Sequence, residues 1–356
     1  MAYTTISKSS EHFNTKLYTG SNYSNAQTGV GFQPDWIWFK RRDSAAQHSL
    51  IDSVRGVTKL LATDLTDAEA TASDALTSFD SDGFTLGADS SNYINFNSAT
   101  YASWNWKAGN SSGSSNTDGS ANNVKVSANT TSGFSIVQGD MNASGSWTFG
   151  HGLGVAPSLI ILRGQNVTSH WFVYHKSLGA GNYIALNSTD GSASDTTFMA
   201  NTAPTSSVFS MNAGTWSAGA GEKIIAYCFA EKAGFSKFGS YKGNGSTWGP
   251  FINCGFKPAW VLWKRTDSAN GWILMDNKRP TVNSVSYGSN PQNALVEPQS
   301  NGAEATSTSY HVNFLSNGFK MRNTNNVYNN TSGSYIYMAF ADEPLVSSNS
   351  IAATGN

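Results

Sequence analysis

The stretch GFQPDWIWFK, at residues 31–40, decides how this chain is organised, because the chain repeats its pattern. The pattern returns as GVAPSLIILR at residues 154–163 and as GFKPAWVLWK at residues 255–264. In each copy a glycine stands three residues before a proline, apolar residues occupy the second to fifth positions after that proline, and a cation follows at the sixth. A repeat of this kind has to be recognised before any local feature, because it sets the architecture.

The match extends beyond these ten residues without a gap. Fourteen residues after the proline, the three copies have His48, Trp171 and Trp272. Eighteen residues after it they have Asp52, His175 and Asp276, and 21 residues after it they have Arg55, Leu178 and Arg279. Each copy ends on an aromatic-rich segment, at residues 101–106, 224–229 and 335–340. Each copy also begins at a phenylalanine, which is Phe13, Phe134 or Phe235. The chain therefore contains three units of one design.

The apolar run after each proline predicts a β-strand that is covered on both sides. Alternate residues of a strand face opposite sides, so Trp36, Trp38 and Lys40 share one face and Ile37 and Phe39 share the other. Both faces are largely apolar, and the run is bounded by glycine and proline, which is typical of a buried strand.

The intervening segments predict tight turns between short strands. The chain has 34 glycines and only 9 prolines, with Asx-Gly pairs at residues 82–83, 118–119, 244–245, 301–302 and 317–318. Such pairs supply the positive φ that hairpins need. The prediction is an all-β chain of three tandem antiparallel β-sandwich modules.

The repeat also predicts domain boundaries. They are an N-terminal arm (1–11), module 1 (12–109), a Gly/Ser/Asn linker (110–133), module 2 (134–233), module 3 (234–344) and a C-terminal tail (345–356). Because only modules 1 and 2 are separated by a linker, we expect modules 2 and 3 to form a rigid pair with module 1 offset. A Gly/Ser-rich linker is ordered only when it packs against another surface. We therefore expect the linker 110–133 to lie on another subunit, and this predicts a homo-oligomer.

Composition narrows the possible partners. Only 13% of the residues are charged, 12% are aromatic, and the net charge is −1, so no basic field favours nucleic acid. No run of about 20 apolar residues predicts a membrane span, and the first residues do not resemble a secretory signal. Cys228 and Cys254 are expected to be buried free thiols.

The acidic residues and histidines of the chain predict structural rather than catalytic roles. A glycosidase needs two carboxylates facing each other across a groove, and no dense acidic motif offers them. We expect Asp52 to pair with Arg55 and Asp276 with Arg279, because the second unit lacks the acid and the arginine together. The six histidines have no metal-ligand spacing, and no cofactor motif is present, so neither metal nor cofactor is expected.

Several aromatic residues lie in polar stretches, where they could stack on sugar faces. They are Tyr93, Trp147, Trp216, Trp248, Tyr310 and Tyr328. Each could instead cap a sandwich or be buried at a contact between modules or subunits.

Six segments of the first unit and its N-terminal arm are distinctive: residues 1–10, 13–20, 29–36, 52–56, 78–84 and 101–109, which read MAYTTISKSS, FNTKLYTG, GVGFQPDW, DSVRG, SFDSDGF and YASWNWKAG. These segments resemble the repeated module of virion proteins from marine tailed bacteriophages. The resemblance is strongest in the first unit, and it implies concanavalin-A-like (SPRY-like or jelly-roll) sandwiches. It carries over no catalytic residues.

The resemblance implies a non-enzymatic protein on the virion surface, made in the host cytoplasm. We expect a tail fibre or appendage that contacts other virion proteins and binds a receptor or glycan on the host, as a trimer if it is a fibre. A capsid decoration protein is one alternative. A secreted glycan hydrolase with lectin-like modules and a host surface-layer or filament subunit are two others.

Overall fold

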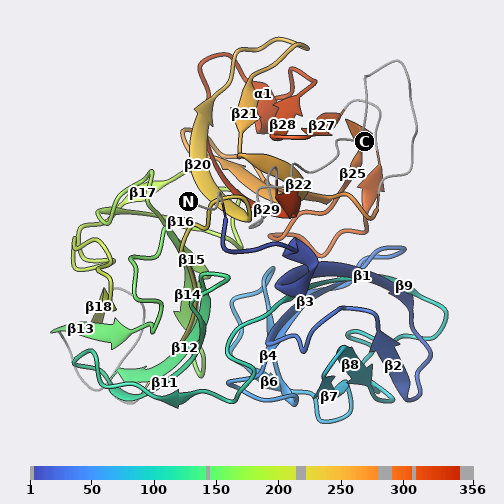
Figure 1. The fold of residues 1–356 in the computed structure, drawn as a ribbon, viewed down its shortest axis with the longest axis vertical. Coiled ribbons are helices and arrows are strands. Elements are labelled where there is room, and N and C mark those ends of the chain that lie inside the picture. Colours follow the sequence, from blue (N-terminus) through green and yellow to red (C-terminus); the bar gives the residue numbers. More distant parts are fainter. Residues whose placement is uncertain (1–3, 142–144, 214–221, 280–290, 307–309, 345–356) are drawn as a thin grey trace.

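The computed structural model describes residues 4–141, 145–213, 222–279, 291–306 and 310–344. Within them the regular secondary structure consists almost wholly of antiparallel strands, and the only helices are the one-turn η1 (Ser9–Glu11) and α1 (Asn326–Asn329). The all-β prediction is confirmed. Figure 1 shows three lobes, one for each repeat, arranged around a common centre.

The first unit contains one large and one small sheet. Its strands are β1 (Phe13–Thr19), β2 (Asn25–Thr28), β3 (Trp36–Arg41), β4 (His48–Asp52), β5 (Lys59–Ala62), β6 (Ala70–Thr71), β7 (Leu76–Asp80), β8 (Gly83–Leu86) and β9 (Thr100–Trp106). The large sheet has the order β1-β9-β3-β4-β5-β6, and the small sheet has the order β2-β8-β7.

The second unit has the same plan with extra edge strands. Its strands are β10 (Ser114–Ser115), β11 (Asn122–Asn129), β12 (Phe134–Met141), β13 (Gly145–Gly150), β14 (Leu159–Gly164), β15 (Phe172–His175), β16 (Asn182–Ala185), β17 (Ala193–Ser194), β18 (Val208–Ala213) and β19 (Glu222–Phe229). The large sheet has the order β10-β11-β12-β19-β14-β15-β16-β17, and β13 pairs with β18.

The third unit ends the chain. Its strands are β20 (Ser236–Lys242), β21 (Phe251–Asn253), β22 (Phe256–Arg265), β23 (Trp272–Asp276), β24 (Pro291–Gln292), β25 (Ala294–Leu295), β26 (Ala305–Thr306), β27 (Val312–Leu315), β28 (Gly318–Met321) and β29 (Ser334–Pro344). The sheets have the orders β20-β29-β22-β23, β21-β28-β27-β24 and β25-β26.

The repeat in the sequence is a repeat of topology. The four-strand orders β1-β9-β3-β4, β12-β19-β14-β15 and β20-β29-β22-β23 are equivalent, with the strand after the proline in the same place each time. The registers agree as well, because Trp36 lies opposite Asp52 and Trp106, just as Trp260 lies opposite Asp276 and Phe340.

Alternation along the strand after the proline separates two kinds of core. In β3, Ile37 and Phe39 face the small sheet of their own unit, in a cluster with Phe84. Trp36 and Trp38 face the other way, into a cluster that contains residues of all three units. The second and third units divide their strand residues in the same manner. Both faces are buried, as the sequence predicted, but the other two units cover one of them.

The shared core joins the three units at their closing strands. Trp106, Phe229 and Phe340 occupy equivalent positions, and the Phe340 ring lies 5.6 Å from the Trp106 ring and 5.9 Å from the Phe229 ring. Trp36 of the first unit stacks on Tyr227 of the second, with ring centroids 4.4 Å apart. Aromatic pairs at these separations add favourable energy beyond simple area burial.

The repeated cation links each unit to a loop of its neighbour. The contacts are Lys40 to the Asn301 carbonyl (2.9 Å), Arg163 to the Thr66 carbonyl (2.9 Å) and Lys264 to the Thr189 carbonyl (3.0 Å). These contacts connect the first unit to the third, the second to the first and the third to the second. The three units therefore form a closed ring with approximate threefold symmetry. Burial lowers the pKa of Lys40 and of Lys264 to about 8.

This ring corrects the expected organisation. The first unit is not offset from a rigid pair, because it shares a core with both neighbours. The predicted linker 110–133 contains β10 and β11, and β11 pairs with β12 as part of the second unit's large sheet. Its order is explained within the chain, so it supplies no argument for a second subunit. The N-terminal arm also belongs to the ring, since Ile6 is buried in the shared core.

Candidate functional site

The six candidate surface aromatics have different environments. Trp248 is exposed, whereas Tyr93, Trp147 and Tyr310 are half-buried against the cores of their units. Tyr328 is only 1% exposed, so its assignment to an open surface is wrong. Its ring is covered because it packs on Trp263, at a centroid distance of 5.2 Å. The remaining candidate, Trp216, lies outside the described residues.

Two of these aromatics, Tyr310 and Tyr328, meet in the third unit. Their rings are stacked, with centroids 5.6 Å apart and planes inclined by 7°. Tyr328 belongs to the short helix α1, which Asn325 caps by accepting a hydrogen bond from the Val327 amide. The Tyr335 hydroxyl donates to the Asn326 carbonyl at 2.6 Å and anchors the same turn.

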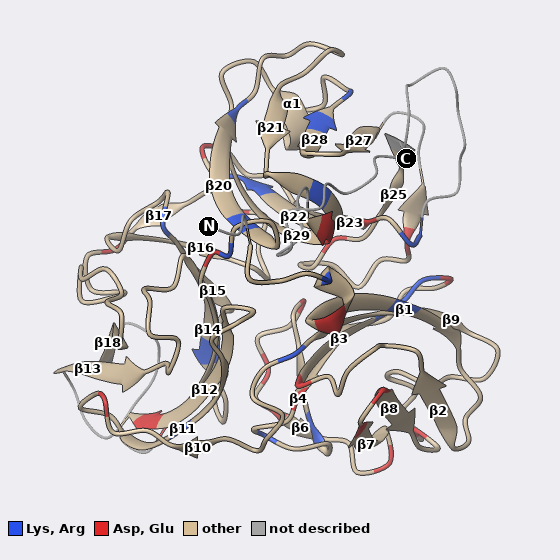
Figure 2. Cartoon of the chain, viewed as in Figure 1, with Lys and Arg blue, Asp and Glu red and all other residues tan. Residues whose placement is uncertain are grey.

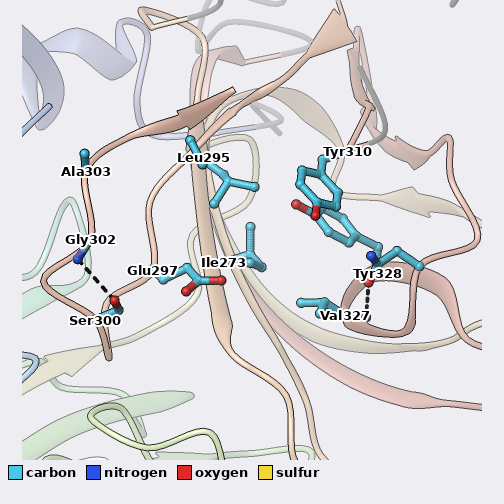
Figure 3. A pocket seen from close by; sticks show the side chains of 11 residues that line it. Ile273, Leu295, Glu297, Ser300, Gly302, Ala303, Tyr310, Val327 and Tyr328 are labelled. Carbon is cyan, nitrogen blue, oxygen red and sulfur yellow. Dashed lines mark hydrogen bonds between the residues drawn. The ribbon is translucent and has the colours of Figure 1, made fainter. Parts of the chain in front are cut away.

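The stacked rings form one wall of a pocket of about 220 Å³. Its lining residues are Ile273, Leu295, Glu297, Ser300, Gly302, Ala303, Ala305, Tyr310, Asn325, Val327 and Tyr328. Figure 3 shows the hydroxyl ends of both tyrosines pointing toward the middle of this pocket, with Glu297 on the opposite side. The pocket therefore has an aromatic end, an apolar floor and a carboxylate end.

The polar groups at the two ends of the pocket are affected by burial. The Tyr328 hydroxyl is buried and has no hydrogen-bond partner within the described chain. Burial raises the pKa of Tyr328 well above 10, and nearby Tyr310 and Glu297 raise it further, so this hydroxyl stays protonated at neutral pH. Burial also raises the pKa of the half-buried Glu297 carboxyl. An unsatisfied buried polar group destabilises the fold, so a bound ligand that accepted a hydrogen bond from the Tyr328 hydroxyl would remove this cost.

Such a site can bind a small ligand that carries hydroxyl groups. The Tyr328 hydroxyl can donate a hydrogen bond, and the Glu297 carboxylate can accept one. The tyrosine pair and the floor of Ile273 and Leu295 can contact the less polar parts of the ligand. The volume is below the usual range of roughly 300–1,000 Å³ for ligand pockets, so a single sugar unit is a better match than a larger molecule.

The predicted Asp–Arg pairs do not line this pocket, and their acids contact a neighbouring unit. Arg55 Nε is 2.5 Å from Asp52 Oδ2, and Arg279 Nε is 2.5 Å from Asp276 Oδ2, with all four side chains fully buried. In the second unit His175 takes the place of the acid and lies 3.3 Å from the Tyr337 carbonyl of the third. These residues stabilise the ring.

Metal and thiol chemistry find no support in the part of the chain that the structure describes. No group of three or more His, Cys, Asp or Glu side chains there could hold a metal ion. Cys228 and Cys254 are free and buried, as predicted, and burial raises the pKa of Cys254 to about 12. No helix among the described residues is long and apolar enough to cross a membrane.

The chain is an all-β protein with a small pocket lined by aromatic, apolar and polar residues. A family model described as a domain of unknown function (DUF7483) matches residues 8–344, so the chain belongs to that family. Searches of curated proteins and of solved structures found no match.

The sequence pointed to Tyr310 and Tyr328 but not to what surrounds them. The sequence gives no signal for Glu297, because nothing in the repeat marks it. A useful signal was the extra length of the third unit, where 77 residues separate the proline from the closing strand, compared with 67 in the other two. The extra residues fall within the segment that carries the pocket.

Proposed function

We propose that this chain is a non-enzymatic glycan-binding protein of the surface of a tailed-phage particle, in a tail fibre or appendage. The single observation that carries the binding role is the pocket of the third unit. There the buried Tyr328 hydroxyl, which has no partner among the described residues, and the Glu297 carboxylate face the same space beside a stacked tyrosine pair.

The composition of the pocket supports binding over hydrolysis. Glycoside hydrolases ordinarily place two carboxyl groups about 5–10 Å apart across the scissile bond. Among the described residues that line this pocket, Glu297 is the one carboxylate. The Asp52 and Asp276 carboxylates are fully buried and paired with arginines. We therefore assign Glu297 the role of a hydrogen-bond acceptor for sugar hydroxyls.

The location on a virion rests on the resemblance of the repeated module to phage virion proteins. The ring supports it indirectly, because a core shared by all three units suits a protein that must remain folded outside a cell. Other virion proteins and further copies of this chain are the partners we propose. Light scattering of the purified protein tests whether it forms a homo-oligomer.

The binding role is tested with a panel of purified bacterial O-chains and capsular polysaccharides that carry no charged groups, so that acidic sugars are kept out of this test. We expect the wild-type chain to bind at least one member and Tyr310→Ala and Glu297→Gln to lose that binding. Tyr183→Ala is the matched control, since Tyr183 is also half-buried among aromatic rings but belongs to the second unit. Failure of the whole panel to bind, or equal binding by the pocket variants, would contradict the proposal.

A further inference from the structure

A second surface of the third unit combines an exposed indole with two cations. Trp248 is 69% exposed and precedes β21, an edge strand of the sheet β21-β28-β27-β24. The guanidinium carbon of Arg322 lies 4.3 Å from the Trp248 ring centroid, and Lys320 Nζ lies 5.5 Å from it. Phe251, which is 43% exposed, lies opposite Lys320 in the pairing of β21 with β28.

The two cations of this patch have no acidic partner within the described chain. Some strand cations in the described residues are paired with acids, as Arg41 is with Asp43 and Arg265 with Asp267, whereas others, such as Lys125, are not. No ion pair of the described residues involves Lys320 or Arg322, and Arg322 Nε is buried without a hydrogen-bond partner. In Figure 2, β28 carries blue with no red segment beside it. The patch therefore has unmatched positive charge in a chain whose net charge is −1.

We propose that Trp248, Lys320 and Arg322 bind a carboxylate-bearing sugar unit of an acidic polysaccharide. The exposed indole offers a flat surface for the less polar face of a pyranose ring. The guanidinium, held against that indole, can form two parallel hydrogen bonds to a carboxylate, a geometry for which arginine is well suited. Lys320 supplies a second, less directional charge.

The size and charge of the patch favour an acidic sugar over nucleic acid. A nucleic-acid surface neutralises many phosphates along a groove, and its affinity depends on the number of those contacts. This patch offers two cations around one exposed tryptophan. A single sugar ring that carries one carboxylate is small enough to contact the tryptophan and both cations together.

The equivalent places in the other two units, as far as the structure describes them, lack this combination. Trp147 of the second unit, like Trp248, stands 13 residues after the phenylalanine that opens its unit. However, β18, the strand paired with β13, reads VFSMNA and contains no lysine or arginine. The exposed Tyr23 of the first unit precedes β2, an edge strand, and provides an aromatic control.

The inference takes its ligand class from the proposed function, but the patch shares no residue with the pocket. Binding of trigalacturonic acid and of its fully methyl-esterified form to the full chain is measured by calorimetry, at low and at high salt. We expect the acid to bind at least about tenfold more tightly than the ester and more weakly at high salt. Arg322→Gln and Trp248→Ala should each lower the affinity for the acid at least about tenfold, and Lys320→Gln should lower it less.

Control variants distinguish this patch from the rest of the surface. Tyr23→Ala and Lys125→Gln, which change an exposed tyrosine and an exposed lysine elsewhere, should bind as the wild type does. Tyr310→Ala should also bind the acid normally, so failure of the pocket proposal leaves this test intact. No binding of the acid, equal binding of the ester, or unaffected patch variants would overturn the inference. So would an oligothymidylate that competes equally, because any polyanion would then suffice.

Discussion

The Tyr227 hydroxyl donates a 2.8 Å hydrogen bond to Asp52 Oδ2 and so ties the closing strand of the second unit to the first. At the next contact of the ring, Trp104 Nε1 donates to Asp276 Oδ2, also at 2.8 Å. At the remaining contact, between the second and third units, His175 lies against the Tyr337 carbonyl. One position of the repeat, 18 residues after the proline, therefore links every pair of neighbouring units.

The substitution Asp276→Asn tests this link. It leaves Arg279 buried without its nearest counter-charge and weakens the acceptor for the Trp104 indole. Because breaking a buried ion pair is costly, we expect the free energy of unfolding to fall by about 3–5 kcal/mol in urea denaturation. Asp267→Asn, at the partly exposed pair with Arg265, is the control and should cost at most about 1 kcal/mol. Equal effects of the two substitutions would show that the contact between units contributes little.

Trp263 connects the core of the third unit to the pocket. It is fully buried at the fifth position after the proline, where the sequence predicted a core residue, and it packs on Tyr328. Trp263→Ala should lower the free energy of unfolding by about 3–5 kcal/mol, as expected for a large aromatic in a packed core. It should also weaken saccharide binding, because Tyr328 loses its support. Trp248→Ala, at an exposed tryptophan, is the control for stability alone, and a melting curve of Trp263→Ala that overlaps the curve of this control would refute the assignment of Trp263 to the core.

Acid should destabilise the ring through His175. Burial lowers the pKa of this histidine to about 4, whereas it is near 6.5 in the unfolded chain. Between these values the unfolded state binds the proton and the folded state does not, so the free energy of unfolding falls as the pH drops from about 6.5 to about 4. The contribution of His175 to this fall is about 3 kcal/mol.

The measurement is urea denaturation as a function of pH, comparing the wild type with His175→Gln. The variant cannot titrate, so its stability should decline less over that interval. Burial also lowers the pKa of His48, which therefore contributes to the decline that remains in the variant. The same pH dependence in both proteins would show that His175 is not a source of the effect.

The shared core predicts one cooperative unfolding transition. Three independent sandwiches would unfold separately, but here each unit buries one face of its large sheet against the others. Scanning calorimetry should give a single peak whose van't Hoff enthalpy equals the calorimetric enthalpy. Two or three resolved peaks would mean that the units are independent.

Much of the fold followed from the residues after each proline. Their apolar character on both faces predicted a strand buried on both sides, and β3, β14 and β22 are such strands. Which surface covers the second face could not be predicted, because strand periodicity reports burial and does not identify the partner. Trp36 and Trp260 are buried because the other two units cover their side of the sheet, and the sequence of one unit does not show that contact.

The pocket was less predictable than the fold. Tyr310 and Tyr328 are 18 residues apart, and their stacking depends on the strands β27 and β28 and on helix α1. A polar flanking sequence suggested that Tyr328 is exposed, but Trp263 packs against its ring. The contacts of a single side chain of this kind depend on tertiary packing, which local composition does not encode.

The most direct test of the binding role is a crystal structure of the protein with the saccharide from the panel that binds best. We predict a sugar ring in the pocket of the third unit, against Tyr310, with one hydroxyl accepting from Tyr328 and another donating to Glu297. A saccharide bound elsewhere on the molecule, with this pocket free of sugar, would contradict the account.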